Sequence, residues 1–400
     1  MVYYINNYYK EDMKLNRVPI ISLASNNKIK YIHYLLNTNK INFTNISFGF
    51  TKTKGYSKSF KYGNDMVYFP CVNFSNKNNY NIISILFTQI YLVFFIMKNV
   101  KQKDTIIMYH HPWISPIFNL VKKIKKFTLL LEVEEICFKD TSKNKIKSFF
   151  YTIFEKNIIK LSDSFIVVND FVKEYVENIK LDVNTENIIV CYGNYSLVNQ
   201  FTNLGRSNKD KNDETVSILY SGSIDKVRGA FEVIELIKTL NDDGYTIYIT
   251  GYGRDNDIKK FKYKIDELDL KKNKILFLGQ LPEEEYLKLL NRVDICLSCQ
   301  NDKEIFAKYS FPSKIINYLA FDKIVVTSNM ESIKRSKVKD CVYYYNSDDL
   351  TSLAGIISDI KNKKQIVLGK EDNYNKIFKL NTETIGLFSK LIKGDNDEFC

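Results

Sequence analysis

The chain has 400 residues, of which 45% are apolar, 14% aromatic and 26% charged, with a net charge of +12. This length suits two domains, and the apolar content excludes a disordered chain, a collagen-like chain and a small disulfide scaffold. The basic excess lies in the first half: residues 1–200 hold 26 Lys and Arg against 15 Asp and Glu, and residues 201–400 hold 32 against 31.

Short apolar runs alternate with helical stretches through the first half. Runs without polar alternation are typical of strands covered on both faces, and they predict strands over 18–24, 105–109, 129–133, 164–168 and 188–192. Residues 28–39 have the spacing of a helix. The most apolar run, 82–97, is shorter than the ~20 residues of a membrane span and predicts a buried or interfacial helix. The N-terminus lacks the apolar stretch of a signal peptide, so we expect a cytoplasmic chain with reduced cysteines.

A polar stretch then separates the halves. We expect an N-terminal Rossmann-like domain over 1–198, a linker over 199–215 and a second domain over 216–372. A closing helix and tail over 373–400 would follow, with packing back on the first domain as a further expectation. The second half predicts strands over 216–220, 245–250, 275–278, 294–298 and 323–327. Its predicted helices cover 230–240, 257–268, 283–291, 313–320, 351–361 and 375–393.

This alternation predicts an α/β fold with two Rossmann-like parallel-sheet domains facing a cleft. Ligands of open parallel sheets bind at the carboxyl ends of the strands. Ser221-Gly222-Ser223 ends one predicted strand, and Arg228 follows before a helix. Glycine permits close approach of a ligand to the backbone, and the arginine fork suits phosphate oxygens. Gly251 and Gly253 form a G-x-G without the third glycine of a dinucleotide site, and taken alone each of these loops favours an ordinary strand–helix turn.

The segment Phe311–Ala320 places Pro312, Ser313 and Lys314 at a predicted helix start. Free N–H groups in a first turn favour anions. A lysine there opposes the helix dipole unless an anion is bound nearby. The segment therefore predicts a phosphate-binding element.

At these residues the sequence resembles the donor-binding half of family 4 glycosyltransferases of the GT-B fold. The resemblance covers residues 216–350 through YSGSIDKVRGAFEVIELIK, YTIYITGYG, ILFLGQLPEEEYLKLLNRVDICLS and FPSKIINYLAFDKIVVTS. The first half matches more loosely, through MYHHPW and LLLEVEEI. The resemblance implies a retaining transfer from a nucleotide-sugar donor to an acceptor bound by the first domain, with no metal or other cofactor required.

The resemblance also implies a set of donor-binding residues. Arg228 stands where the family carries a basic residue for the donor diphosphate. Ser223, five residues earlier, stands where members often have an arginine, and the family's paired glutamates are replaced by Tyr309 and Asn317. Glu304 would replace the first glutamate only with a rearranged loop. The expected donor-binding residues are Gly222, Ser223, Arg228, Gly253, Glu304, Ser313, Lys314 and Asn317.

Two of the three histidines, His110 and His111, follow the predicted strand over 105–109. One of them would bond a sugar or move a proton, as a histidine at this place does in similar family members; the alternative is that one caps the strand and the other packs. Glu132 and Glu134 would share one face of a strand. We expect His110, His111 and Glu134 to be catalytic, the last on its resemblance to the family's Glu-Val-Glu-Glu pattern. No metal site is expected.

Lysines 98, 101, 103, 122, 123, 125 and 126 are expected to form a basic patch beside apolar residues. It would suit an anionic membrane leaflet and a lipid-diphosphate acceptor; a solvated helix face is the alternative. No nucleic-acid-binding module is recognisable, so no nucleic-acid partner is expected. Cys296 and Cys299 are assigned no function.

The sequence therefore predicts a hexosyl- or related glycosyltransferase that assembles a surface polysaccharide such as capsule, exopolysaccharide or O-antigen. Its partners would be a nucleotide-sugar and a glycan or lipid-diphosphate-linked acceptor. It would be cytoplasmic, with peripheral attachment to the inner face of the membrane as a further expectation. Two alternatives stay open: a catalytically idle partner subunit of a transferase, and a nucleotide-sugar 2-epimerase.

Overall fold

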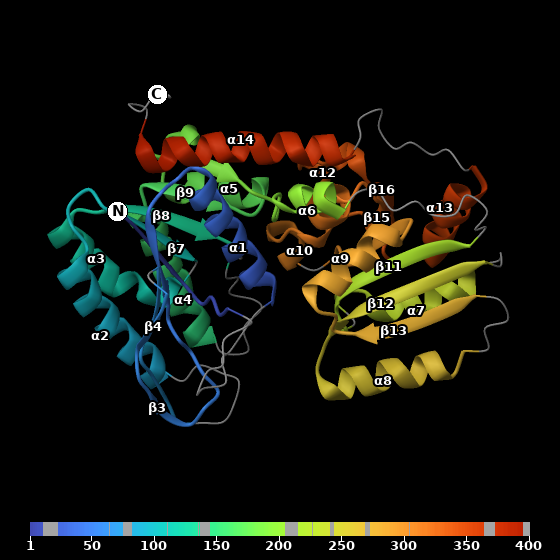
Figure 1. Ribbon diagram of the computed structural model, residues 1–400, viewed down its shortest axis with the longest axis horizontal. Coiled ribbons are helices and arrows are strands. Elements are labelled where there is room, and N and C mark those ends of the chain that lie inside the picture. Colours follow the sequence, from blue (N-terminus) through green and yellow to red (C-terminus); the bar gives the residue numbers. More distant parts are fainter. Residues whose placement is uncertain are drawn as a thin grey trace. The chain divides into compact units, whose positions relative to one another are not determined.

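The computed structural model describes residues 1–10, 23–63, 65–74, 82–109, 111–134, 136, 145–204, 215–225, 227–240, 244–268, 273–303, 305–363 and 373–394. The chain forms two compact units (Figure 1). The first comprises Met1–Cys191 with Thr384–Cys400, and the second comprises Tyr192–Glu383. Each is built around its own sheet.

The sheet of the first unit has the order β10-β9-β8-β7-β1-β2-β5-β4. The strands, in that order, are Ile188–Val190, Ser164–Val167, Thr128–Val133, Thr105–Tyr109, Val2–Asn6, Phe43–Ser47, Met66–Tyr68 and Phe60–Tyr62. All neighbours are parallel except β4 and β5. A separate antiparallel ribbon pairs β3 (Gly55–Ser57) with β6 (Cys71–Asn73). The central strands are buried along nearly their whole length, as expected for strands covered on both faces.

Four helices of this unit lie side by side in chain order, each against the next: α2 (Ile82–Asn99), α3 (Ser115–Lys125), α4 (Lys145–Leu161) and α5 (Asp170–Ile179). Right-handed crossovers that all run in one direction along the sheet place them on one face. The connection from β1 to β2 runs the opposite way, which places α1 (Leu23–Thr38) on the other face. There Asn39 donates to the carbonyl of Ile385, in the part of α14 (Asn373–Lys393) that belongs to this unit.

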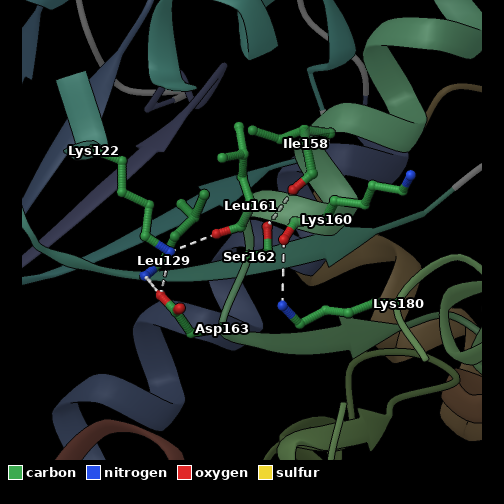
Figure 2. A network of polar contacts seen from close by, with 8 residues as sticks. All are labelled: Lys122, Leu129, Ile158, Lys160, Leu161, Ser162, Asp163 and Lys180. Carbon is green, nitrogen blue, oxygen red and sulfur yellow. Dashed lines mark hydrogen bonds and ion pairs between the residues drawn. The ribbon is translucent and has the colours of Figure 1, made fainter. Parts of the chain in front are cut away.

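A polar network ties α3 and α4 to the amino ends of β8 and β9 (Figure 2). One carboxylate oxygen of Asp163 accepts from the Leu129 amide at 2.7 Å and from the Lys122 ammonium at 2.6 Å. Lys122 also donates to the Leu161 carbonyl, and Lys180 donates to the Lys160 carbonyl at 3.3 Å. Lys122 is thus a structural member of the predicted basic patch.

The second unit has a fully parallel sheet in the order β13-β12-β11-β14-β15-β16. These strands are Lys274–Gly279, Tyr245–Tyr252, Val216–Ser223, Ile295–Ser298, Ile324–Ser328 and Tyr343–Tyr345. Its helices are α6 (Leu197–Leu204), α7 (Ala230–Thr239), α8 (Asp255–Asp266), α9 (Glu283–Arg292), α10 (Ile305–Tyr309), α11 (Lys314–Ala320), α12 (Glu331–Lys334) and α13 (Leu350–Lys363), with the first part of α14. Ile218, Val233, Ile247 and Ile357 belong to one core cluster that joins the sheet to α7 and α13.

The predicted α/β fold with two Rossmann-like parallel sheets is confirmed. The strand expected over 18–24 is wrong where it can be checked, because Leu23 and Ala24 begin α1, while residues 18–22 lie outside the described residues. The first strand is instead β1, whose polar Asn6 is buried through a 2.7 Å hydrogen bond to Asn45. The run over 82–97 is a helix, as expected, and no helix in the described part of the chain is suited to crossing a membrane.

The expected linker, 199–215, begins inside α6, and residues 205–214 lie outside the described residues. The closing helix divides between the units, with Thr384 as the first residue assigned to unit 1. The expected domain boundaries at 198 and 216 thus differ from the boundary between the two compact units, which follows Cys191. The reason is that the chain from Tyr192 to Leu204 packs with the second unit. One such contact is that of Phe201 with Phe321, whose ring centres are 5.5 Å apart.

Two glycines allow the cost of backbone strain to be measured separately from the cost of steric overlap. Gly229 and Gly279 both have positive φ, of 80° and 66°. A Cβ on Gly229 would lie 1.8 Å from the Cys299 carbonyl oxygen, whereas one on Gly279 would meet no atom within 4 Å. Gly279→Ala should cost about 1 kcal/mol from the left-handed backbone alone. Gly229→Ala should cost at least about 3 kcal/mol, because overlap adds to strain. Urea unfolding of both variants measures the difference, and equal losses would contradict the close approach.

Candidate functional site

In the second unit, the candidate site lies at the carboxyl end of β11. The Tyr220 hydroxyl lies 3.0 Å from the Ser223 carbonyl and 2.9 Å from the Arg228 carbonyl and donates to this pair. The Arg228 amide donates to the Asp225 carboxylate at 2.7 Å. The loop from Ser223 to Arg228 is therefore held to the strand end from within, which fixes the backbone of both predicted donor-binding residues.

The glycines at this edge have different roles. Gly222 and Gly251 are partners on neighbouring strands, and a Cβ on Gly251 would lie 1.8 Å from the Gly222 carbonyl oxygen. A Cβ on Gly253 would lie 2.9 Å from the Ile224 carbonyl oxygen. Packing therefore accounts for both glycines of the short G-x-G. Gly222 differs, since the atom nearest to its Cβ position is the Lys314 ammonium nitrogen at 3.6 Å, so the missing side chain leaves that cation uncovered.

Lys314, the first residue of α11, carries a buried ammonium group. It donates to the Ser221 carbonyl at 3.2 Å and lies 4.3 Å from the centre of the Tyr220 ring. Burial lowers the pKa of Lys314 to about 8. No carboxylate forms an ion pair with Lys314 among the described residues. A desolvated cation held by one carbonyl and one ring face is suited to binding an anion.

Arg228 supplies a second cation close by, and its charge contributes to lowering the pKa of Lys314. Its guanidinium donates to the Gln300 side chain at 2.9 Å and lies 5.5 Å from the Phe306 ring centre. Within the described ranges Arg228 forms no ion pair either. Two neighbouring cations repel each other. The charge of Asp225 acts on Lys314 without forming an ion pair, and a doubly charged anion such as a diphosphate would relieve the repulsion further.

A hydroxyl cluster lies beside these cations. The Ser221 hydroxyl lies 2.8 Å from that of Tyr318 and 3.4 Å from that of Tyr286. Asn317, one of the expected donor-binding residues, is half-buried and hydrogen-bonds Tyr286. Burial raises the pKa of Tyr286 to about 12, so this phenol stays neutral and acts as a donor or acceptor. Asn317 is thus held in place by a protein partner at the site.

Two further expected donor-binding residues, Ser313 and Glu304, provide less evidence for the site. Ser313 precedes α11 and makes no capping hydrogen bond through its side chain. Its Cβ lies 3.3 Å from where a Cβ on Gly193 would stand, so the start of α11 packs closely on that backbone. Glu304 lies outside the described residues.

In the first unit, polar groups gather at the carboxyl ends of β1, β7 and β8, which are neighbours. His110 lies outside the described residues. His111 follows β7, and its Nε2 lies 2.7 Å from the side-chain nitrogen of Asn7, which follows β1. Burial lowers the pKa of His111 to about 4, so its ring is neutral at physiological pH. Because an amide nitrogen only donates, Nε2 accepts from Asn7 and the ring proton lies on Nδ1, which leaves the neutral ring with one hydrogen-bond donor.

Two carboxyl groups of β8 differ sharply in their surroundings. Glu134, just after the strand, forms an ion pair with Lys28 of α1. Glu132 is 1% exposed, and its Oε1 has no hydrogen-bond partner among the described residues. Burial, reinforced by the charge of Glu134, raises the pKa of Glu132 to about 8. This edge therefore combines an ionised and a neutral carboxyl group, a combination suited to binding hydroxyl groups.

Sequence reasoning missed Asn7, Lys28, Tyr286 and Gln300 as members of these sites. Gln300 and Asn7 each follow a strand, but this position alone does not distinguish a site residue from an ordinary loop residue. Lys28 and Tyr286 come from helices, where spacing gives no signal. As for metals, no group of three His, Cys, Asp or Glu suited to hold one occurs in the part of the chain that the structure describes.

Comparison with known proteins gives a consistent pattern. Residues 202–373 match the family described as glycosyl transferases group 1. No match was found among curated protein sequences. A sucrose-phosphate synthase from Thermosynechococcus elongatus superposes with a TM-score of 0.69 at 13% identity, over 98% of this chain and 99% of that one.

Two further solved structures are similar. Anabaena Alr3699/HepE in complex with UDP and glucose gives a TM-score of 0.63 at 12% identity, covering 97% of this chain and 99% of its own. The lipopolysaccharide outer core galactosyltransferase WaaB in its apo form gives a TM-score of 0.60 at 13% identity, covering 98% of this chain and 99% of its own. At these identities the structures establish the fold, and its two parallel sheets are those of the GT-B class.

The raised pKa of Glu132 predicts a pH-dependent stability. Its carboxyl binds a proton more tightly when folded, so its contribution to the free energy of unfolding falls as pH rises from 4.5 to about 8. Glu132→Gln should therefore be more stable than the parent by roughly 2–4 kcal/mol above pH 8 and about equal below pH 4.5. Urea unfolding across this range tests it, with the exposed Glu186→Gln as control. A difference that does not change with pH would contradict a protonated Glu132.

Proposed function

Residues 202–373 belong to the group 1 glycosyl transferase family and make this chain a glycosyltransferase, and on that premise we propose which substrates it uses. It moves a sugar from a nucleotide-sugar, with retained anomeric configuration and without a catalytic metal. The acceptor is a glycan or a lipid-diphosphate-linked glycan of a surface polysaccharide. The reaction takes place in the cytoplasm, at the inner face of the membrane where such an acceptor resides.

The single observation that carries this proposal is the pair of cations beside Gly222. In the transfer, the bond from the anomeric carbon to the diphosphate oxygen breaks, and negative charge grows on the departing nucleoside diphosphate. Arg228 and Lys314 lie without carboxylate partners among the described residues, so their charge is available to that group. Preorganised cations of this kind lower the barrier because they need no rearrangement as the charge develops.

We assign the acceptor to the first unit. His111 and Glu132 present neutral polar groups at adjacent strand ends, and Glu134 is held by Lys28. Neutral and ionised oxygen and nitrogen atoms side by side suit the alternating donors and acceptors of sugar hydroxyls. His111, being neutral with its Nε2 accepting from Asn7, is suited to orient an acceptor hydroxyl by donating a hydrogen bond from Nδ1.

Uridine diphosphate is the first nucleotide to test, because the similar Anabaena structure contains UDP and glucose. In a thermal-shift panel of UDP, GDP, ADP, dTDP and CMP, a ligand at a hundredfold above its dissociation constant adds about 2.7 kcal/mol of apparent stability. One nucleotide should stand out. Absence of a shift with all of them would favour the idle partner subunit, for which the neutral Tyr309 and Asn317 provide the reason.

The cation pair predicts a specific loss of nucleotide affinity. Arg228→Ala and Lys314→Met should each weaken binding of the nucleoside diphosphate about 10- to 100-fold, because a hydrogen bond to a charged group contributes about 1.5–3 kcal/mol. Isothermal titration measures this, and the melting temperature is recorded alongside. Arg292→Ala, at the exposed end of α9, is the matched control and should bind as the parent does. Unchanged affinity in both site variants would refute the diphosphate site.

Substitution of His111 should have the opposite effect, because it should lower turnover and leave nucleotide affinity unchanged. His111→Gln should lower turnover at least about a hundredfold and leave nucleotide affinity unchanged, because the residue serves the acceptor side. His33→Gln is the control, since His33 of α1 is a half-buried histidine whose Nε2 lies 2.8 Å from the Asn45 side-chain oxygen in β2. With its pKa about 4, His111 should add no inflection to the pH profile of turnover near neutrality. Full turnover in His111→Gln would remove it from the catalytic set.

A further inference from the structure

Helix α2 is apolar on both sides, and its buried side carries polar residues among Leu92 and Ile96. Ser84, Thr88 and Gln89 are buried, and Ser84 and Gln89 donate to the carbonyls of Val72 and Trp113. The opposite side carries large apolar residues that are more than half exposed, at spacings of three and four: Ile83, Leu86, Ile90 and Phe94. The outer side of a helix that faces water is typically polar, so this apolar side is suited to being covered by a partner surface.

The neighbouring helix continues this surface. α3 lies against α2 (Figure 1) and exposes Leu120 by 64% and Ile124 by 57%, one turn apart. We refer to Ile83, Leu86, Ile90, Phe94, Leu120 and Ile124 as the α2–α3 face. At the start of α2, the antiparallel ribbon adds the exposed Tyr56, whose ring packs edge-on against Phe87 at 6.2 Å. Aromatic residues at the border of an apolar surface are typical of membrane interfaces.

The charges around this face are almost all of one sign. From residue 82 to residue 126 the sequence holds seven lysines and a single acid, Asp104. Asp104 pairs with the N-terminal amine at 3.2 Å, and Lys122 is engaged by Asp163. The other six lysines make no ion pair among the described residues. They lie within or just after the last turns of α2 and α3: Lys98, Lys101, Lys103, Lys123, Lys125 and Lys126.

We propose that the α2–α3 face seats in the headgroup region of an anionic bilayer, with α2 lying along the membrane plane. The apolar side chains enter the acyl boundary while the lysines bind lipid phosphates at its edge. A second copy of the chain is disfavoured as the occupant because the lysines of the two copies would repel each other. Nucleic acid is disfavoured because a phosphate backbone does not cover a stripe of Ile, Leu and Phe. The surface is independent of which sugar or acceptor the enzyme uses.

The test is co-sedimentation of the full chain with vesicles of phosphatidylcholine, with and without about 30% phosphatidylglycerol. The parent should bind the anionic vesicles at least about tenfold more tightly, and raised salt should weaken the binding. Ile90→Glu combined with Phe94→Glu should reduce binding at least tenfold, and Lys98→Glu combined with Lys123→Glu should abolish the preference for anionic lipid. Leu181→Glu, at an 88% exposed site after α5, is the matched control and should bind as the parent does.

Circular dichroism melting of each variant shows that loss of binding is not loss of folding, since all the substituted side chains are exposed. Vesicle binding by the parent that the two paired variants do not change would overturn the proposal, as would absence of binding to any vesicle. If the parent sediments as a lipid-free dimer that Ile90→Glu and Phe94→Glu dissociate, the occupant is a second copy and the bilayer proposal fails. Nucleotide affinity, measured separately, distinguishes each of these outcomes from failure of the proposed transfer reaction.

Discussion

The buried ammonium of Lys314 is the constraint on which the donor end of the second unit depends. Taking a charge out of water is costly unless polar groups replace the lost hydration. Here the Ser221 carbonyl and the Tyr220 ring do so, and the Tyr220 hydroxyl is in turn directed at the carbonyls of Ser223 and Arg228. The strand end, the loop and the start of α11 are therefore fixed together by one cation. Its incomplete compensation within the protein is also what makes an anionic ligand favourable.

The two strand edges differ in charge, and this difference suits two different substrates. The edge in the second unit carries two cations, Arg228 and Lys314, that form no ion pair among the described residues, although the charge of Asp225 acts on Lys314. The edge in the first unit carries a neutral imidazole, a carboxyl with a raised pKa and a carboxylate neutralised by Lys28. A diphosphate is drawn to the first kind of edge and a polyhydroxyl compound to the second. At the proposed donor site, Tyr309 and Asn317 stand where the family carries its paired glutamates, so Arg228 and Lys314 would face a diphosphate with less negative charge nearby.

The parts of the fold that could be predicted from sequence are those whose burial is purely apolar. The strand over 105–109 was located to the residue because both of its faces are covered. The sequence pattern did not predict β1, because its polar Asn6 is buried only through a hydrogen bond to Asn45, 39 positions away. No local pattern reveals such a pairing. The same limit applies to the site: Lys314 was found through its anomalous helix position, whereas Tyr286 and Gln300 reach the site only through the packing of α9 and the end of β14. Local chemistry predicts which loops matter, and long-range packing decides which side chains complete them.

The basic patch shows why a charge count alone does not identify a partner. Lys122 belongs to the same run of lysines as Lys123 and Lys125, yet it closes the network around Asp163 and the amino end of β8 (Figure 2). Its charge is already compensated, so it contributes little attraction to an outside anion. The lysines without such a partner lie next to an apolar helix side whose polar residues face inward. It is this combination, rather than the net charge of the first half, that distinguishes a membrane-facing surface from a merely solvated one.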